Sequence, residues 1–167
     1  MLWFTNDPFK VKANNQRVLQ PHSARHQKLI AAGGEQREAE YADGAYKIRK
    51  GSYGNPTAGR IPRNVLRYGH SCPDHRQYRQ DAAQLGLPAH GAPFPKKMVR
   101  FLIEYLSEPG DLVVDNMAGK LTVAKAAEEL GRRWMVTEWM WDYIRAAAER
   151  FRSAVGFELS KPFTGAA

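Results

Sequence analysis

The sequence predicts an α/β fold for its C-terminal part. Between residues 96 and 151, apolar residues recur at helical spacing in three stretches, which are separated by two short apolar runs at 111–115 and 133–138. Helices that alternate with short apolar strands are typical of a parallel sheet covered by helices. The chain has 167 residues, close to the length of one domain, so we expect one compact unit with an irregular portion.

The first expected element of this part is an amphipathic helix between Pro95 and Pro109. Pro95 suits the first turn of a helix, and Pro109 with Gly110 suits the region beyond its end. The apolar residues follow helical intervals of three and four: Met98, Phe101, Leu102, Tyr105 and Leu106.

A strand, a helix and a second strand should follow. We expect the first strand at residues 111–115, a helix that ends at Leu130 with Gly131 as its stop, and the second strand at residues 133–138. A last helix carries its apolar residues on one face: Met140, Ile144, Ala147 and Phe151.

The N-terminal segment has weaker periodicity. The opening residues MLWFT predict a strand, and its abrupt start suggests that the chain lacks a segment present in relatives. Residues 10–91 are rich in turn formers and predict loops, apart from a short helix at 23–30 and a strand at 45–50. We therefore expect a loop-rich segment at 1–91, a βαβ part at 92–156 and a tail at 157–167.

The net charge of +8 is unevenly distributed along the chain. Residues 1–100 carry 17 Lys and Arg against 7 Asp and Glu, whereas residues 101–167 carry 8 against 10. Such asymmetry is typical of a segment that faces a polyanion, although a solvated basic face explains the charge equally well.

The cysteine content and the absence of long apolar runs exclude several classes. A single cysteine, Cys72, excludes an internal disulfide framework, and there is no signal peptide and no apolar run near the roughly 18 residues of a membrane helix. We expect a soluble, cytoplasmic protein. His70, Cys72 and His75 have metal-like spacing, but no second pair completes a site, so no metal is expected, and nothing nearby favours Cys72 as a nucleophile.

Three residues predict a ligand site at the carboxyl ends of the two strands. Asp115 ends the first strand, Gly119 lies in the turn that follows, and Glu138 ends the second strand 19 residues beyond Gly119. This spacing favours an adenosine-containing ligand, because an acid at that position can accept hydrogen bonds from ribose hydroxyls. The alternative is an ordinary βαβ unit whose acids happen to end strands.

Two other phosphate-binding loops fit poorly. A dinucleotide loop needs G-x-G-x-x-G, yet Leu121 stands where a second glycine should be. A P-loop needs G-x-x-x-x-G-K-[ST], yet Val114 replaces the first glycine and Leu121 replaces the hydroxyl residue.

Residues 90–151 resemble the C-terminal part of the S-adenosylmethionine-dependent DNA amino-methyltransferases, the bacterial and phage enzymes of DNA methylation and restriction-modification. The segment H-P-x-x-[FK]-P, which lies beside the methionine part of the cofactor, is matched by His90, Phe94 and Pro95. The loop D-P-F-x-G-S-G-T is matched by Asp115, Ala118, Gly119 and Thr122, and the ribose-binding acid by Glu138. The resemblance implies S-adenosyl-L-methionine as cofactor and part of a Rossmann-like methyltransferase sheet with helices on both faces.

The loop departs from the family pattern at four positions. Asn116 replaces Pro, Met117 replaces Phe, Lys120 replaces Ser and Leu121 replaces the second Gly. Met117 should keep an apolar wall for the cofactor. Leu121 is expected to adopt a right-handed helical conformation and to add bulk near the methionine end.

By the same resemblance, residues 1–91 form the DNA or target-recognition segment and residues 92–156 the cofactor-binding part. Double-stranded DNA is the expected partner, and the tyrosines of this segment, Tyr46, Tyr53, Tyr68 and Tyr78, either stack on bases or pin down a loop-rich domain. The residues expected to meet phosphates are Lys47, Arg49, Lys50, Arg60, Arg63, Arg67, Arg76 and Arg79.

The catalytic motif of the family, [DNS]-P-P-[YFW], does not occur in the chain. Its nearest match is Asn6, Asp7, Pro8 and Phe9. This tetrapeptide is either a degenerate catalytic motif or the loop that follows the catalytic motif in the family. We therefore expect a fragment or subunit that methylates an exocyclic amine of adenine or cytosine once a second chain supplies the motif. The alternative is a catalytically silent DNA-binding remnant.

Overall fold

The computed structural model describes residues 4–158, which fall into two compact units. The main unit comprises residues 4–14 and 65–158, and the insert unit comprises Asn15–Asn64. The units divide after Asn14 and after Asn64, and the functional boundary that the sequence places near Gly91 stays a prediction. No helix within residues 4–158 is both long and apolar enough to cross a membrane.

The main unit is built on a βαβ motif, and this confirms the predicted α/β class. Strands β3 (Leu112–Asp115) and β4 (Arg133–Val136) pair in parallel, and helix α4 (Thr122–Glu129) connects them. The register pairs Leu112 with Arg133 and Asp115 with Val136, so both strands end at the same edge. A ligand site at this edge draws on the segments that follow both strands.

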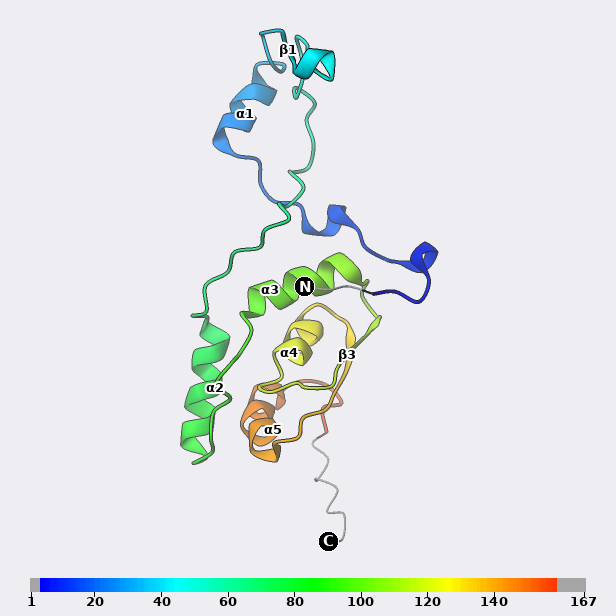
Figure 1. Cartoon of the computed structure of the whole chain (residues 1–167). Coiled ribbons are helices and arrows are strands. Elements are labelled where there is room, and N and C mark those ends of the chain that lie inside the picture. Colours follow the sequence, from blue (N-terminus) through cyan, green and yellow to red (C-terminus); the bar gives the residue numbers. More distant parts are fainter. Residues whose placement is uncertain (1–3, 159–167) are drawn as a thin grey trace. The chain divides into compact units, whose positions relative to one another are not determined.

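Helix α4 lies between α3 (Lys96–Leu106) and α5 (Trp141–Ala148) (Figure 1) and contributes to two hydrophobic clusters. On one side Ala126 and Ala127 pack against Val99 and Ile103 of α3. On the other side Ala124 packs with residues of α5 and with Phe151 of the 3-10 helix η4 (Glu149–Phe151). The small alanine side chains allow helices to approach α4 closely from both sides.

The strand pair is covered on one face. Val113, Trp134 and Val136 pack against the two clusters. Leu112, Val114 and Met135 alternate with them and are 50%, 58% and 56% exposed, so in the described part of the chain the second face remains open. Helices were expected on both faces, as is usual for a parallel sheet.

Helix α2 (Pro73–Gln84) lies in a stretch that the sequence predicted to be loop, and this prediction was wrong. Pro73 begins the helix, and Gly86 follows its end with a φ of +65°. Few of its residues are apolar, so its amphipathic pattern is weak. Its buried side chains face α5 and include Tyr78 and Ala82, which belong to the hydrophobic core.

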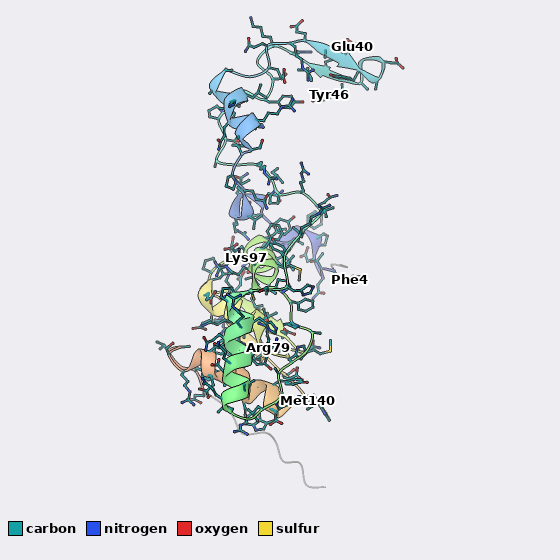
Figure 2. The ribbon with its side chains drawn as sticks, turned by 90° about the vertical axis from the view of Figure 1, so that its left-hand side faces the viewer. Phe4, Glu40, Tyr46, Arg79, Lys97 and Met140 are labelled. Atoms are coloured by element: carbon teal, nitrogen blue, oxygen red, sulfur yellow. The ribbon has the colours of Figure 1, made fainter. Side chains whose placement is uncertain are left out.

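The insert unit contains short elements. These are η2 (Asn15–Val18), α1 (Ala24–Ala31), β1 (Ala39–Tyr41), η3 (Ala42–Gly44) and β2 (Tyr46–Ile48). The helix expected at 23–30 and the strand expected at 45–50 are both confirmed, and β1 pairs with β2 in antiparallel fashion. Figure 2 shows the side chains of Glu40 and Tyr46 on this hairpin.

The opening strand predicted from MLWFT falls mostly on residues 1–3, outside the described residues. Phe4 and Thr5 are in no strand, and Phe4 is exposed. The first described element is the 3-10 helix η1 (Pro8–Lys10). Of the predicted tail, Phe157 packs against the core beside Phe151, with ring centroids 5.3 Å apart, and residues 159–167 lie outside the described part.

Candidate cofactor site

Backbone hydrogen bonds tie the loop after β3 to the segment after β4. The Thr137 N–H donates to the Asp115 carbonyl over 2.9 Å, and the Ala118 N–H donates to the Thr137 carbonyl over 3.0 Å. The Asp115 carboxylate accepts the Met117 N–H over 3.1 Å, which closes a tight turn at the strand end. The predicted loop therefore lies at the carboxyl edge of both strands.

Glu138 holds this loop through its carboxylate. Its Oε2 accepts the Gly119 N–H over 2.7 Å, and its Oε1 accepts the Met140 N–H over 2.9 Å. Burial raises the pKa of Glu138, but hydrogen bonds from the Met140, Gly119 and Trp139 backbones outweigh it, so the pKa lies below its ordinary value. These three donors leave at least one of the roughly four lone-pair sites of the ionised carboxylate for a further donor.

His90 lies directly against Gly119. A Cβ atom on Gly119 would stand 3.0 Å from His90 Nε2, and Gly119 has a φ of +50°, so a larger residue would be strained and crowded. The His90 N–H donates to Tyr78 Oη over 2.9 Å, and its ring meets Tyr143 edge-on with centroids 5.1 Å apart. The structure thus brings together His90, Gly119 and Glu138, as the sequence predicted.

Leu121 differs from the expectation. It was expected to be right-handed and to add bulk near the methionine end of the site, but it has φ +59° and ψ +37°, in the left-handed region. Its side chain is 2% exposed and packs in the core with Ala118 and Ala124. Burial of the leucine offsets the roughly 1–2 kcal/mol cost of this backbone conformation. The loop therefore keeps a conformation that normally requires glycine, and the added bulk lies in the core.

Lys120, the other unusual loop residue, is buried in an ion network that the sequence did not reveal. Its Nζ lies 2.7 Å from Asp74 Oδ2, and Arg150 Nη1 lies 2.9 Å from both Asp74 oxygens. Arg150 Nη2 also donates to the Lys120 carbonyl. Pro73 at the start of α2 and Gly86 after its end were signals of the helix that carries Asp74.

Charges in this network shift the pKa of both partners. Burial lowers the pKa of Lys120, and the Asp74 carboxylate opposes that shift without reversing it. Burial raises the pKa of Asp74, but Arg150, Lys120 and Lys96 together bring it below its ordinary value. The Asp74 pKa thus moves further from neutrality, and Lys120 Nζ lies within hydrogen-bond distance of its carboxylate.

The remaining predicted cofactor residues divide between core and surface. Ala118 and Thr122 are buried, and Pro95 caps α3. Phe94 and Met117 are 62% and 81% exposed. The Met117 side chain, which was expected to form an apolar wall for the cofactor, is therefore mostly open to solvent in the described part of the chain. Trp139 is 95% exposed and follows Glu138 directly.

One surface hollow lies elsewhere in the main unit. It is lined by Glu128, Arg133, Trp134 and Phe157, at the opposite end of β4 from Glu138. Its position at the amino end of the strand does not fit the ligand site of a parallel sheet.

The eight predicted DNA-contact residues are all exposed and occur in both units. Lys47 pairs with Glu40 at 2.8 Å, and Arg60 Nε donates to the Pro21 carbonyl. Arg79 lies on α2 (Figure 2). Lys47, Arg49, Lys50, Arg60 and Arg63 belong to the insert unit, and Arg67, Arg76 and Arg79 belong to the main unit.

The predicted tyrosines do not share one environment. Tyr46 and Tyr53 are about half exposed, at 49% and 47%, and Tyr68 is partly buried. Tyr78 is fully buried in the core, so for this ring the structure favours the packing alternative over stacking on DNA bases.

The degenerate motif candidate forms a capped turn. The Asp7 carboxylate accepts the Phe9 N–H over 2.9 Å at the start of η1, and the Phe9 ring is 97% exposed. The chain that follows is anchored before β3, because Lys12 Nζ bonds Asp111 over 2.7 Å and the Asn14 N–H bonds the Tyr105 carbonyl over 2.9 Å. The candidate site lies after β3, at the opposite end of the strand.

The segment that contains His70, Cys72 and His75 begins α2. Cys72 is buried at the N-cap of the helix. Within residues 4–158, no group of three or more His, Cys, Asp or Glu residues is arranged to hold a metal ion.

Comparison with known proteins identifies relatives of most of the chain. Residues 1–149 match the model of a family described as N6/N4 DNA methylases. The Type II methyltransferase M.PvuII of Proteus hauseri is 34% identical over 149 residues, which are 89% of this chain and 44% of that protein. The chain therefore spans less than half the length of this relative.

Two solved structures are also similar. The PvuII DNA methyltransferase, described as cytosine-N4-specific, has 39% identity and a TM-score of 0.49 over 55% of this chain and 32% of that chain. A putative DNA modification methylase from Thermus thermophilus, in complex with S-adenosyl-L-methionine, has 28% identity and a TM-score of 0.37 over 61% of this chain and 42% of that chain.

Proposed function

The chain belongs to the N6/N4 DNA methylase family, and on that premise we propose that it is the cofactor-binding and DNA-recognition part of a DNA amino-methyltransferase. Its substrate would be double-stranded DNA and its cofactor S-adenosyl-L-methionine. The target would be an exocyclic amine of cytosine or adenine.

The observation that carries this proposal is the bond between the Gly119 N–H and Glu138 Oε2, which joins the two strand ends. An adenosine ribose needs an acceptor for its hydroxyls, and beside its three backbone bonds the Glu138 carboxylate keeps acceptor capacity at this edge. His90 against Gly119 leaves no room for a Cβ, and His90 Nδ1 is buried without a hydrogen-bond partner among the described residues. These features fit a nucleoside cofactor.

In this arrangement each residue has a distinct part. Glu138 would hold the ribose, Gly119 would let the backbone approach the cofactor, and the Asp115 turn would shape the loop. Phe94 and His90 would lie beside the methionine portion, as the family resemblance implies. When bound, the cofactor supplies the sulfonium methyl group that is transferred to the target amine.

DNA recognition would fall to the exposed cations of both units. Their guanidinium and ammonium groups suit phosphate oxygens, which position a protein on the duplex without reading its sequence. Access to the target amine requires the base to leave the stack. The half-exposed rings of Tyr46 and Tyr53 have surface available for stacking.

The catalytic step needs a group that this sequence does not supply. Asp7 caps a turn and Phe9 points into solvent, on a segment anchored before β3, so this tetrapeptide is poorly placed to hold a flipped base beside Gly119. We infer that a second chain or segment completes an active enzyme. The alternative is a silent DNA-binding remnant with a decayed pocket, and binding of S-adenosyl-L-methionine to the chain would contradict it.

Isothermal titration with S-adenosyl-L-methionine tests the site. We expect the natural chain to bind and the Glu138→Ala variant to bind at least about tenfold more weakly, a loss of about 1.4 kcal/mol, because the ribose acceptor is removed. Glu149→Ala is the matched control, since Glu149 pairs only with Arg152 on the surface in the contacts described. Equal absence of heat with the natural chain and Glu138→Ala would sink the proposal.

A further inference from the structure

The cofactor loop is held from its inner side by charges on three separate elements. Asp74 lies in the first turn of α2, Lys120 lies in the loop, and Arg150 lies in η4. Their side chains are 4%, 1% and 4% exposed. The ring of Tyr78 lies near both cations, 6.0 Å from Lys120 Nζ and 5.4 Å from Arg150 Cζ. The network is therefore shielded from water and weakly screened.

Asp74 is the anion that both buried cations share. Lys96 also approaches it at 3.9 Å, but Lys96 is closer to Glu129, at 2.8 Å. Two buried cations against one anion leave a net charge of +1, so removal of Asp74 would leave Lys120 and Arg150 facing each other. A buried charge that loses its partner is strongly destabilised.

The network acts on the backbone as well as on side chains. Arg150 donates to the Lys120 carbonyl, while the Lys120 ammonium is drawn inward to Asp74. Lys120 thus fixes the peptide between Gly119, whose N–H meets Glu138, and Leu121, which stays left-handed. If the Lys120 ammonium lost its bond to Asp74, it would be a buried charge without a partner. It would then move towards solvent, and the peptides on both sides would rotate.

We propose that Asp74 and Lys120 are positioning residues that hold the Gly119 N–H on Glu138 and so keep the cofactor loop in its binding conformation. Their contribution to cofactor binding rests on the proposed function. Their effect on the Gly119 N–H does not, because it concerns the free chain. Helix α2 is then part of the cofactor site, although neither residue touches the cofactor.

Hydrogen exchange in the cofactor-free chain tests this directly. The readout is the protection of the Gly119 amide relative to the Gly110 amide, which bonds the Gly131 carbonyl over 2.8 Å in the same unit. Asp74→Asn should lower Gly119 protection at least about tenfold more than Gly110 protection. Without the shared anion, the loop should open locally while the strand pair stays closed. Equal losses at the two amides would overturn the proposal.

Two further variants separate charge from packing. Lys120→Met keeps the Asp74 and Arg150 pair, so the chain should fold, and Gly119 protection should fall selectively but less than in Asp74→Asn. The double variant returns the buried net charge to +1, so it should regain part of the protection that Asp74→Asn loses. Losses that simply add would show a packing role and contradict the proposal.

The matched control is Lys12→Met. Lys12 bonds Asp111 over the same 2.7 Å, but its side chain is about half exposed and the pair lies before β3, at the other end of the strand from the cofactor loop, so Gly119 protection should not change. In titrations with S-adenosyl-L-methionine, the variants that lose more Gly119 protection should bind the cofactor more weakly. If the natural chain binds no cofactor, the proposed function fails, while the exchange result still decides whether Asp74 and Lys120 position the loop.

Discussion

The main unit and the insert unit are ordered by different means. The main unit places two hydrophobic clusters around α4, with fully buried alanines and the rings of Trp134 and Phe151. In the insert unit, the buried hydrophobic residues are Val18 and Ile48. Its backbone segments instead approach each other closely at glycines. A Cβ on Gly34, for example, would stand 2.3 Å from the Gly51 carbonyl oxygen.

This difference suggests a division of labour. A site that must hold a small cofactor needs groups fixed within fractions of an ångström, which dense side-chain packing provides. A surface that meets the DNA backbone needs exposed charge and tolerates local adjustment. The main unit has the dense packing that the first task needs, and the predicted DNA contacts, which the second task concerns, include Lys47, Arg49 and Lys50 of the insert unit.

The largest expected effect comes from opening the core of the main unit. Phe151 is 1% exposed, and its ring centroid lies 5.1 Å from that of Trp134. Phe151→Ala should lower the free energy of unfolding of this unit by about 3–5 kcal/mol, because it leaves a cavity beside α4. Hydrogen exchange of the β3 and β4 amides measures the loss.

Val155→Ala serves as the control for that change, because Val155 is fully exposed four residues further along the chain. It should alter stability by less than about 0.5 kcal/mol. A similar small effect of Phe151→Ala would show that packing does not order the main unit, and the contrast between the units would fail.

A smaller effect is expected from the glycine contacts of the insert unit. Gly34 has a φ of +101° and lies against Gly51, so Gly34→Ala should cost about 1–3 kcal/mol through strain and the clash with backbone. Protection should fall at the Gly51 amide, which bonds the Glu35 carbonyl over 2.8 Å.

Gly33→Ala sharpens this test. Gly33 also has a positive φ, of +74°, but a Cβ there would meet nothing within 4 Å. Its replacement should therefore cost only the backbone penalty, about 1 kcal/mol. If both variants lose the same protection, the close approach of Gly34 to Gly51 does not order the insert unit.

The smallest effect concerns the proposed DNA contacts. If Arg49 and Lys50 each neutralise a phosphate, Arg49→Ala and Lys50→Ala should each reduce the slope of log affinity against log salt by about 0.9. Gel-shift titration of duplex DNA at several salt concentrations measures it. Lys97→Ala, which removes an exposed cation of α3 outside the predicted set, should leave the slope unchanged. Equal changes in all three would indicate general charge rather than a defined contact surface.

How much the sequence revealed depended on periodicity. Helices α3, α4 and α5 and strands β3 and β4 were predictable, because regular apolar spacing records which face each element buries. Helix α2 was missed because it is mostly polar and its buried face includes Asp74 and Asp81, which look like solvent-facing residues in a sequence. An acid is recognisable as buried only when its partner, here Lys120 from 46 residues away, is known.

The same contrast holds within the site. The spacing of Asp115, Gly119 and Glu138 after two apolar strands was enough to predict that they meet, because parallel strands end at one edge. The conformation of Leu121 and the direction of Lys120 were beyond the sequence. A left-handed leucine and a buried lysine are each unfavourable locally, and they persist because the core receives the leucine side chain and Asp74 with Arg150 fixes the lysine. The sequence thus determines which backbone conformation and which exposure each residue prefers. Where Leu121 and Lys120 depart from these preferences, tertiary contacts compensate for the free-energy cost, and only the structure shows them.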